Sequence, residues 1–301
     1  MNEFNLIDFY FKNNNLNKNT ILGIGDDAAV VKINNTNVVS CVDTLVEGVH
    51  FAKNYKAKDI ATKALAANLS DIAAMGAIPK WFSLALTMPK VNHKWLAEFS
   101  KSLFKTANKY DIDLIGGDTT KGTLTISIQV VGITKKNSFL TRSNAKLNDD
   151  IYVSGTIGNA ALALKGYESL NEYLFNPAPR IELGKNLIGV ANSCIDISDG
   201  LLQDLEHILT KSNVGANIDL EKIPLGNKLK NYIKETNDWC LALAGGDDYE
   251  LCFTVDEKYR PEIKAISRKL NIKLTNIGKI TNVHKLNIKG FNNNCKGYKH
   301  F

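Results

Sequence analysis

Glycine followed by aspartate recurs along the chain at positions that resemble tight turns. The strings are Gly25-Asp26-Asp27, Gly116-Gly117-Asp118, Asp196-Ile197-Ser198-Asp199-Gly200 and Gly245-Gly246-Asp247-Asp248. Glycine lets the backbone turn tightly and approach a ligand closely, and carboxylate oxygens bind hard cations such as magnesium. The pairing therefore predicts a site that holds metal ions and phosphate groups.

Length and charge narrow the class of protein. At 301 residues the chain exceeds the size at which one hydrophobic core keeps growing, so two domains are expected. No apolar run approaches the roughly 20 residues of a membrane span, and the first residues lack the pattern of a signal peptide. We therefore expect a cytoplasmic protein without a membrane partner. The net charge of +6 comes from scattered lysines, which argues against nucleic-acid binding.

The five cysteines favour neither a zinc site nor a disulfide framework, because their number is odd and no Cys-x-x-Cys spacing occurs. We expect reduced thiols, most of them buried. They are Cys41, Cys194, Cys240, Cys252 and Cys295.

Strand-like and helix-like segments alternate along the chain. Strands are predicted at residues 38–42, 84–87, 114–115, 123–134, 151–154, 194–197 and 247–255. Helices are predicted at residues 57–75, 94–109, 159–165 and 199–211. The turn at Gly155 and Gly158 joins a strand to a helix, which suits either a phosphate cradle or a simple tight turn.

Asp71 continues an apolar stripe of the helix at 57–75 that contains Ile60, Ala64 and Ala67. It should therefore face inward near the helix end, where an unpaired carboxylate is costly. We expect it to meet a cation, a donor or water, and the alternative is a helix-end carboxylate in solvent.

Two further groups of acids follow from the predicted elements. Asp196, Ser198 and Asp199 lie at a strand-to-helix junction, and helix capping explains one of them but not all. Asp247 and Asp248 lie at the mouth of the strand that continues to residue 255. Both positions suit metal or ligand binding.

Ordered motifs across nearly the whole chain resemble the thiamine-monophosphate kinase family. The motifs are Gly23-Ile-Gly-Asp-Asp-Ala-Ala-Val30, Val42-Asp-Thr-Leu-Val-Glu-Gly-Val-His-Phe51, Ala67-Asn-Leu-Ser-Asp-Ile-Ala-Ala-Met-Gly76, Ile115-Gly-Gly-Asp-Thr-Thr120, Leu140-Thr-Arg-Ser143, Ile195-Asp-Ile-Ser-Asp-Gly-Leu201, Gly245-Gly-Asp-Asp-Tyr-Glu-Leu251 and Lys296-Gly-Tyr-Lys-His-Phe301. One Gly-Asp-Asp string would be weak evidence, whereas this ordered series is specific.

The resemblance implies the two-domain α/β fold of the aminoimidazole ribonucleotide synthetase-like superfamily. It implies an N-terminal domain at residues 1–146 that binds ATP and magnesium, and a C-terminal domain at residues 147–301 that completes the substrate site. It also implies a homodimer in which the N-terminal sheets pair. The implied reaction is transfer of the γ-phosphoryl group of ATP to thiamine monophosphate, which gives thiamine diphosphate in the last step of its biosynthesis.

The resemblance also implies residue roles. The positions that match magnesium ligands are Asp27, Val42, Asp43, Asp71, Asp118, Asp196 and Asp199. The positions that match nucleotide-binding residues are Gly117, Asp118, Arg142, Ser198 and Tyr110. The positions that match thiamine phosphate-binding residues are His50, Asp247 and Tyr298. The catalytic set implied is Asp43, Asp71, Asp118 and Arg142.

Some positions depart from the family pattern or allow a second interpretation. Val42 replaces a Ser or Thr, so only its backbone carbonyl could bind metal there. Asp247 replaces a Glu that is one methylene longer. His50 could instead be a hydrogen-bonded structural histidine, and Arg142 could form a surface salt bridge.

The chemistry of the substrates favours direct in-line transfer. ATP and a phosphate monoester are both polyanions, so several cations are needed to bring them together. The attacking phosphate oxygen has a second pKa of about 6 and is largely ionised at neutral pH, so no general base is required. A covalent route needs an activated nucleophile beside a base, and His50 has no convincing serine or cysteine partner.

Two other functions remain open on sequence alone. The chain could be a sister ATP-dependent synthetase of the superfamily, because one fold hosts several chemistries. It could also be a nucleotide-binding module that has lost catalysis. Turnover on another substrate would favour the first alternative, and ATP binding without turnover would favour the second.

Overall fold

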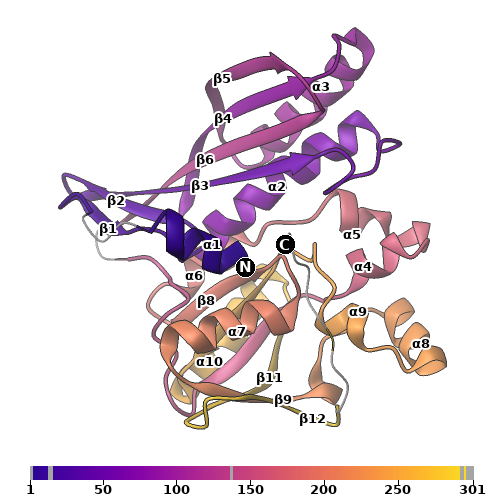
Figure 1. Cartoon of the computed structure of the whole chain (residues 1–301). Coiled ribbons are helices and arrows are strands. Elements are labelled where there is room, and N and C mark those ends of the chain that lie inside the picture. The colour runs from indigo at the N-terminus through magenta and orange to yellow at the C-terminus, as the bar shows by residue number, and fades with distance from the viewer. Residues whose placement is uncertain (1–2, 13–15, 136–137, 292–294, 296–301) are drawn as a thin grey trace.

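The first half of the chain forms a six-stranded sheet in the order β1-β2-β3-β6-β4-β5, shown at the top of the computed structural model in Figure 1. The structure describes residues 3–12, 16–135, 138–291 and 295. The strands are β1 Thr20–Leu22, β2 Ala29–Ile33, β3 Thr36–Val46, β4 Ile78–Met88, β5 Asp113–Lys121 and β6 Thr125–Lys135. β4 and β5 run parallel, with α3 as the crossover between them.

Two helices, α2 Ala57–Ala74 and α3 His93–Lys109, cover one face of this N-terminal sheet. The side chains of β3 differ between the two faces of the sheet. Val39 and Cys41 are buried on the helix-covered face, whereas Val42 on the other face is 64% exposed. Trp81 and Ile78 of β4 are also exposed. No helix among the described residues covers the second face of the N-terminal sheet.

The second half of the chain forms another six-stranded sheet, in the order β12-β9-β11-β7-β10-β8. The strands are β7 Asp150–Ser154, β8 Ala191–Ile197, β9 Gly215–Asp219, β10 Glu250–Val255, β11 Leu274–Thr281 and β12 Leu286–Lys289. Every residue of β10 is buried, because successive side chains alternate between two cores. The sheet is thus covered on both faces at β10, whereas Asn217 of β9 and Asn287 and Lys289 of β12 are exposed.

Short helices complete the fold. The remaining α-helices are α1 Glu3–Tyr10, α4 Asn159–Leu164, α5 Asn171–Phe175, α6 Ile181–Leu187, α7 Leu201–Ser212, α8 Asn227–Thr236, α9 Cys240–Leu243 and α10 Arg260–Leu270. The 3-10 helices are η1 Glu168–Leu170, η2 Leu220–Lys222 and η3 Glu257–Tyr259. α7 packs on β8, and α10 packs against α6 on the other side. No helix among the described residues has the length and apolarity that a membrane crossing requires.

Helix α2 lies between the two halves of the molecule (Figure 1). It contacts β3 and β6 of the N-terminal sheet as well as β8 and α6 of the C-terminal half. Its many alanines allow this close approach from several sides, and most of its residues are buried. The core around α2 is continuous with Leu251 and Phe253 of β10. One helix therefore carries side chains to the junction of the two halves.

One predicted turn and the start of one predicted strand have a different local structure. The Gly116-Gly117-Asp118 string is not a turn, because it lies inside β5 and pairs with β4. A Cβ on Gly117 would lie 1.8 Å from the Leu84 carbonyl oxygen, so the glycine is needed for close strand packing. The strand predicted at 247–255 begins only at Glu250, because Asp247 and Tyr249 have positive φ angles of 68° and 49°.

The prediction of five reduced cysteines is wrong for one pair. Cys240, at the start of α9, forms a disulfide with Cys295. The two residues are 55 positions apart, and no local spacing pattern marks such a pair. Cys41, Cys194 and Cys252 are free and buried, as expected.

Candidate active site

A cavity of about 1090 Å³ opens where β3, α2 and two of the Gly-Asp loops meet. Its walls come from both halves of the chain, so it forms only when the two halves pack together. The predicted site residues that line it are Val42, Asp43, His50, Asp71, Asp196, Ser198, Asp199 and Asp247. Segments that are distant in sequence therefore converge on one space.

Three carboxylates cluster beside this cavity, and two of them, Asp71 and Asp196, line it. Asp27 lies in the loop before β2, Asp71 lies near the end of α2, and Asp196 lies near the end of β8. One oxygen of each lies within 4.8 Å of the others, a spacing that could hold a metal ion. Asp71 faces inward, as the stripe on its helix predicted. We refer to Asp27, Asp71 and Asp196 as the carboxylate cluster.

Arg142 is the cation nearest to the carboxylate cluster. Its Nη2 and Nε donate to Asp27 Oδ1 at 2.7 and 3.2 Å, and its backbone N–H donates to Asp26 Oδ1 at 2.8 Å. The other oxygen of Asp27, Oδ2, is buried and has no hydrogen-bond partner among the described residues. A buried carboxylate oxygen without a donor is costly, so this atom is suited to bind a cation. Arg142 is thus part of a buried ion pair rather than a surface salt bridge.

Burial and mutual repulsion raise the pKa of several carboxyls in this region. Burial, with the charges of Asp43 and Asp196, raises the pKa of Asp71 well above its usual value. Burial and the charge of Asp27 raise the pKa of Asp196 to about 8. Burial and the charge of Asp199 raise the pKa of Asp43 to about 6. The carboxyls therefore cannot all ionise beside Arg142 alone, and a bound cation would favour their ionised forms, which is the electrostatic condition of a cation site.

The loop that carries Ser198 and Asp199 is fixed by a residue that the sequence analysis missed. The backbone N–H groups of Ser198, Asp199 and Gly200 all donate to Asp204 Oδ2, at 3.1, 3.1 and 3.0 Å. Asp204 lies in the first turn of α7 and is buried. It holds the loop in one conformation, with Ser198 and Asp199 on the cavity wall.

Asp247 also lies on the cavity wall. Its carboxylate forms an ion pair with Lys63 of α2, with Nζ and Oδ2 2.7 Å apart, and accepts a bond from the Tyr249 hydroxyl at 3.1 Å. The Asp247 backbone N–H donates to the Ser198 carbonyl at 2.8 Å, which joins two Gly-Asp loops. Sequence reasoning missed Lys63. The available signal was its spacing, because Lys63, Ala67 and Asp71 are four residues apart on one helix face.

His50 also lies on the cavity wall. Its Nδ1 accepts a hydrogen bond from the backbone N–H of Val46 at 3.0 Å. This bond orients the ring, as the structural alternative for His50 anticipated. His50 lines the cavity, and its contact with a substrate remains a prediction.

Other predicted residues lie elsewhere in the single chain. Asp118 and Gly117 lie on the edge strand β5, three strands from β3, which puts Asp118 about 14 Å from Asp43. Tyr110 caps the end of α3 and packs partly buried beside the N-terminal core. Tyr298 lies outside the described residues.

Comparisons with known proteins agree on one family. Residues 25–134 match the family of AIR synthase related proteins in its N-terminal domain, and residues 151–290 match its C-terminal domain. A thiamine-monophosphate kinase of Buchnera aphidicola subsp. Acyrthosiphon pisum is 45% identical over 304 residues, covering 96% of this chain and 93% of that protein.

Solved structures give the same answer. The crystal structure of thiamine-monophosphate kinase from Stenotrophomonas maltophilia has a TM-score of 0.82 and 41% identity, with 91% of this chain and 92% of that chain covered. A structure described as AaThiL complexed with AMPPCP and TMP has a TM-score of 0.87 and 32% identity, and the match covers 100% of this chain and 97% of that chain.

Proposed function

The chain belongs to the thiamine-monophosphate kinase family and is an ATP-dependent phosphotransferase that acts on thiamine monophosphate, and from this premise we propose which of its residues perform the transfer. The observation that carries the proposal is the convergence of Asp71 and Asp196 of the carboxylate cluster with His50 and Asp247 on one cavity. A similar chain is described as a complex with AMPPCP and TMP, which supports a cavity that takes both substrates.

The carboxylate cluster fits magnesium. One oxygen of each carboxylate lies close to the others, the raised pKa values of Asp71 and Asp196 show that a compensating cation is lacking, and Asp27 Oδ2 is buried without a donor among the described residues. Asp27, Asp71 and Asp196 would hold the first ion, with Asp43 and Asp199 beside them on the cavity wall. Magnesium, when bound, neutralises phosphate charge and aligns the reacting groups. Roles for Val42, through its carbonyl, and for Asp118 rest on the family resemblance.

The transfer proceeds directly from ATP to thiamine monophosphate. A phosphate oxygen of thiamine monophosphate forms a bond to the γ-phosphorus while the bond to the β–γ bridging oxygen breaks and ADP leaves. That oxygen is already ionised, since the second pKa of a phosphate monoester is about 6. His50 has its Nδ1 occupied by the Val46 N–H and need only orient substrate. Arg142 holds Asp27 and presents its guanidinium toward nucleotide phosphates.

Thiamine monophosphate binds at the wall formed by His50 and Asp247. Asp247 is held by Lys63 and Tyr249, so its carboxylate is fixed before substrate arrives. Tyr298 is proposed to close this wall by resemblance. On the nucleotide side, Ser198 lies on the loop that Asp204 fixes, and Gly117, Asp118 and Tyr110 are proposed to contact ATP.

A homodimer would explain where the residues of β5 act. The uncovered face of the N-terminal sheet carries exposed apolar side chains, among them Val42, Trp81 and Ile115. Exposed apolar faces of this kind are typical of interfaces between subunits. Pairing of two such faces would bury them and bring Asp118 toward the site of the second chain. We also propose that the enzyme works in the cytoplasm, where its co-substrate ATP is available.

The test is product formation by the purified protein with ATP, magnesium and thiamine monophosphate. We expect thiamine diphosphate from the parent and a loss of at least ~100-fold in rate in Asp43→Asn and Asp71→Asn. Asp111→Asn, a matched change at an exposed position with positive φ, should keep parent activity.

Loss in all three variants would contradict the assigned roles. ATP binding without product in the parent would favour a nucleotide-binding module. Product from a different acceptor would favour a sister synthetase.

A further inference from the structure

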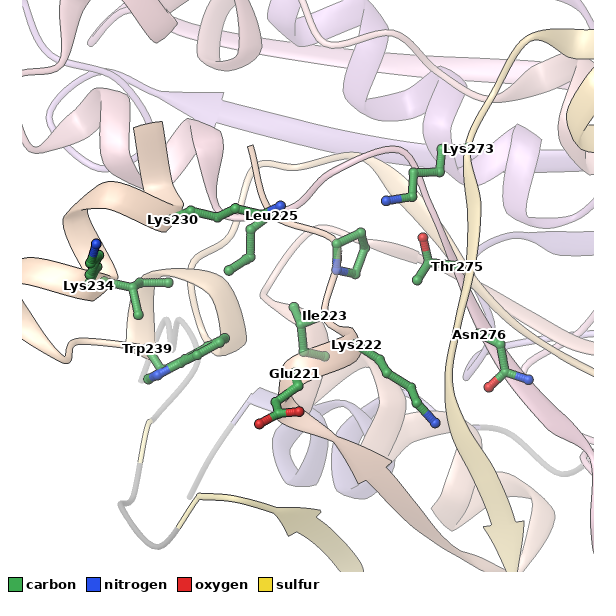
Figure 2. Close-up of a pocket in the computed structure, with 12 residues that line it drawn as sticks. Glu221, Lys222, Ile223, Leu225, Lys230, Lys234, Trp239, Lys273, Thr275 and Asn276 are labelled. Atoms are coloured by element: carbon green, nitrogen blue, oxygen red, sulfur yellow. The ribbon is translucent and has the colours of Figure 1, made fainter. Parts of the chain in front are cut away.

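A second cavity, of about 590 Å³, lies in the C-terminal half, and Figure 2 draws the residues that line it. It is formed by η2, the segment that follows it, α8 and β11. None of the described residues that line it belongs to the carboxylate cluster or lines the first cavity. Its volume is within the ~300–1,000 Å³ of small-molecule sites.

The rim of this cavity is strongly basic. Lys222, Lys230, Lys234 and Lys273 line it, and Glu221 is the single carboxylate among its described lining residues. Lys222 lies 3.8 Å from Asp219, but the other three lysines form no ion pair with any described residue. Several unneutralised ammonium groups around one opening produce a positive potential that attracts anions.

The interior of the cavity is apolar. The buried residues Ile223, Pro224 and Ile233 line it, and the indole of Trp239 lies on one side (Figure 2). Thr275 Oγ1 is buried at the cavity and has no hydrogen-bond partner among the described residues. A flat apolar wall, a hydroxyl without a partner and a cationic rim are the elements with which proteins bind aromatic anions.

The walls of this cavity are hydrogen-bonded to the Gly155 turn. Gly155 N–H donates to the Lys273 carbonyl at 2.8 Å, and Ile157 N–H donates to the Pro224 carbonyl at 3.0 Å. The next residue, Gly158, donates its N–H to both oxygens of Asp248 at 2.9 and 2.7 Å.

A second connection runs through α9. Trp239 precedes this helix, and its carbonyl accepts the N–H groups of Ala242 and Leu243 at 3.0 and 3.1 Å. The helix leads directly into the Gly245–Asp248 string, which carries Asp247. Both walls of the cavity are therefore joined by short hydrogen-bonded paths to the loop that faces the active site.

We propose that this lysine-rimmed cavity is a second ligand site, which binds a small anion that carries a flat aromatic ring, and that its occupancy changes the position of the Asp247 loop. The anion contacts Lys230, Lys234 and Lys273, and the ring lies against Trp239. The existence of the site is independent of the proposed function, whereas the coupling to substrate binding rests on the role proposed for Asp247.

The binding test uses isothermal titration of the full chain with 4-nitrophenyl phosphate, in the presence of magnesium and saturating ADP. We expect saturable binding of 4-nitrophenyl phosphate. Inorganic phosphate and uncharged 4-nitrobenzyl alcohol should each bind with a Kd at least about tenfold higher. The combined variant Lys230→Gln, Lys234→Gln, Lys273→Gln should raise the Kd about tenfold or more. All three lysines are exposed, so these changes leave the core intact.

The matched control removes the same charge from another surface. It combines Lys94→Gln, Lys101→Gln and Lys105→Gln on α3, all exposed. Its Kd should equal that of the parent. No saturation in the parent, an unchanged Kd in the first variant, or an equal loss in the control would each overturn the site.

A second measurement tests the coupling separately. The KM for thiamine monophosphate is determined with and without 4-nitrophenyl phosphate. A coupled site should shift this KM about fivefold or more in the parent and in the α3 control, but not in the Lys230, Lys234 and Lys273 variant. Binding with an unchanged KM would retain the site and overturn the coupling, and a KM shift in all three proteins would show competition at the active site instead.

Discussion

Two buried aspartates of the C-terminal sheet have opposite electrostatic surroundings. Asp196 of β8 pairs with Leu251 near one end of β10, and Asp150 of β7 pairs with Val255 at the other end. Asp196 is 3% exposed and Asp150 is 0% exposed. Burial alone would raise both pKa values. Burial does raise the pKa of Asp196, to about 8, but the pKa of Asp150 is below its usual value.

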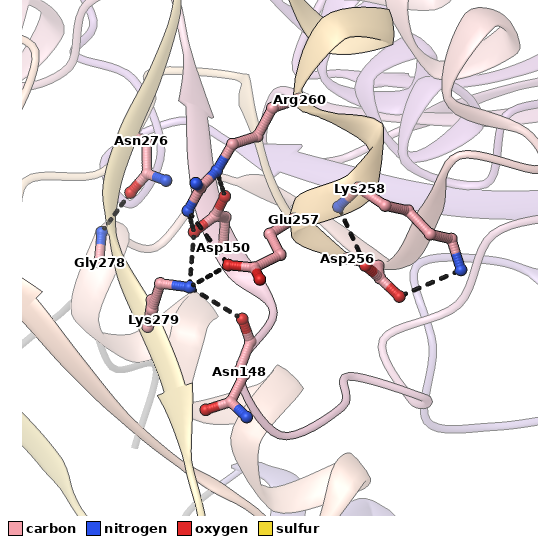
Figure 3. A network of polar contacts seen from close by, with 9 residues as sticks. All are labelled: Asn148, Asp150, Asp256, Glu257, Lys258, Arg260, Asn276, Gly278 and Lys279. Carbon is pink, nitrogen blue, oxygen red and sulfur yellow. Dashed lines mark hydrogen bonds and ion pairs between the residues drawn. The ribbon is translucent and has the colours of Figure 1, made fainter.

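Partners make the difference. Burial pushes the pKa of Asp150 upward, but Arg260 donates to both of its oxygens at 2.5 and 2.9 Å, and Lys279 lies 3.4 Å away (Figure 3). Glu257 binds Lys279 at 3.1 Å and completes the network. Asp196 instead faces Asp27 and Asp71. The chain thus neutralises one buried carboxylate completely and leaves the other for a ligand, which separates a structural acid from a functional one.

The sharpest test of this contrast is Asp196→Asn. It should lower kcat by about 10³-fold, because a ligand oxygen of the metal site is replaced by an uncharged amide. The same change should raise the thermal midpoint of the metal-free protein, since one member of a repelling group is removed. Turnover assays check the fall in kcat, and thermal melts of the metal-free protein check the rise in the thermal midpoint. A variant that loses stability together with activity would make Asp196 a structural acid like Asp150.

Lys63→Gln tests Asp247, a carboxylate that is paired like Asp150 but lies in the active site like Asp196. Asp247 lies in the active site, yet its charge is neutralised by a lysine of the same chain, with Lys63 nearly fully buried. Removal of Lys63 leaves Asp247 free to turn away, so we expect the KM for thiamine monophosphate to rise about tenfold, with a smaller change in kcat. Lys58→Gln, an exposed lysine on the same helix, is the control. Equal effects of the two changes would refute a positioning role.

The pH dependence of stability should follow the raised pKa values of the cluster. Asp43 and Asp196 keep protons in the folded state up to about pH 6 and 8, whereas their usual pKa is 3.8. The folded state therefore binds more protons than the unfolded state in this window, and the free energy of unfolding falls as pH rises through it. Each proton difference costs up to ~1.4 kcal/mol per pH unit.

Magnesium with a nucleotide should reverse this trend, because it binds the ionised carboxylates. Thermal melts near pH 5.5 and pH 8.5 are the measurement, with the larger ligand effect expected at the higher value. Asp196→Asn should flatten the metal-free slope. A midpoint that is independent of both pH and ligand would contradict a carboxylate site.

Sequence reasoning found the parts of the site that local pattern encodes. Asp71 was predicted to face inward from a helical stripe, and Asp196 was predicted at a strand-to-helix junction. Both predictions depend on periodicity within one element, and the structure brings the two side chains together. The two-domain α/β fold followed from the family resemblance and is confirmed.

Contacts between distant segments were beyond the reach of the sequence. Lys63 and Asp247 are separated by 184 positions, and their ion pair depends on how α2 packs between the two halves. The Cys240 and Cys295 disulfide likewise requires that one end of the chain return to α9. Asp118 was assigned to a turn because glycine is common in turns, but its glycines serve close strand packing.

Asp150→Asn completes the contrast with the smallest expected effect. The amide keeps the shape but loses the charge that Arg260 and Lys279 neutralise, and these two residues are partly exposed, so water screens much of the loss. We expect the thermal midpoint to fall by roughly 2–4 °C, while kcat and KM stay at parent values because the network lies at the far end of β10 from Asp196. Acidification should also lower the stability of the parent through this residue, because its depressed pKa contributes stability that is lost as pH falls through the folded value. In Asp150→Asn the loss of stability on acidification should be smaller than in the parent. If the two proteins lose stability equally as the pH falls, other carboxyls control the acid dependence.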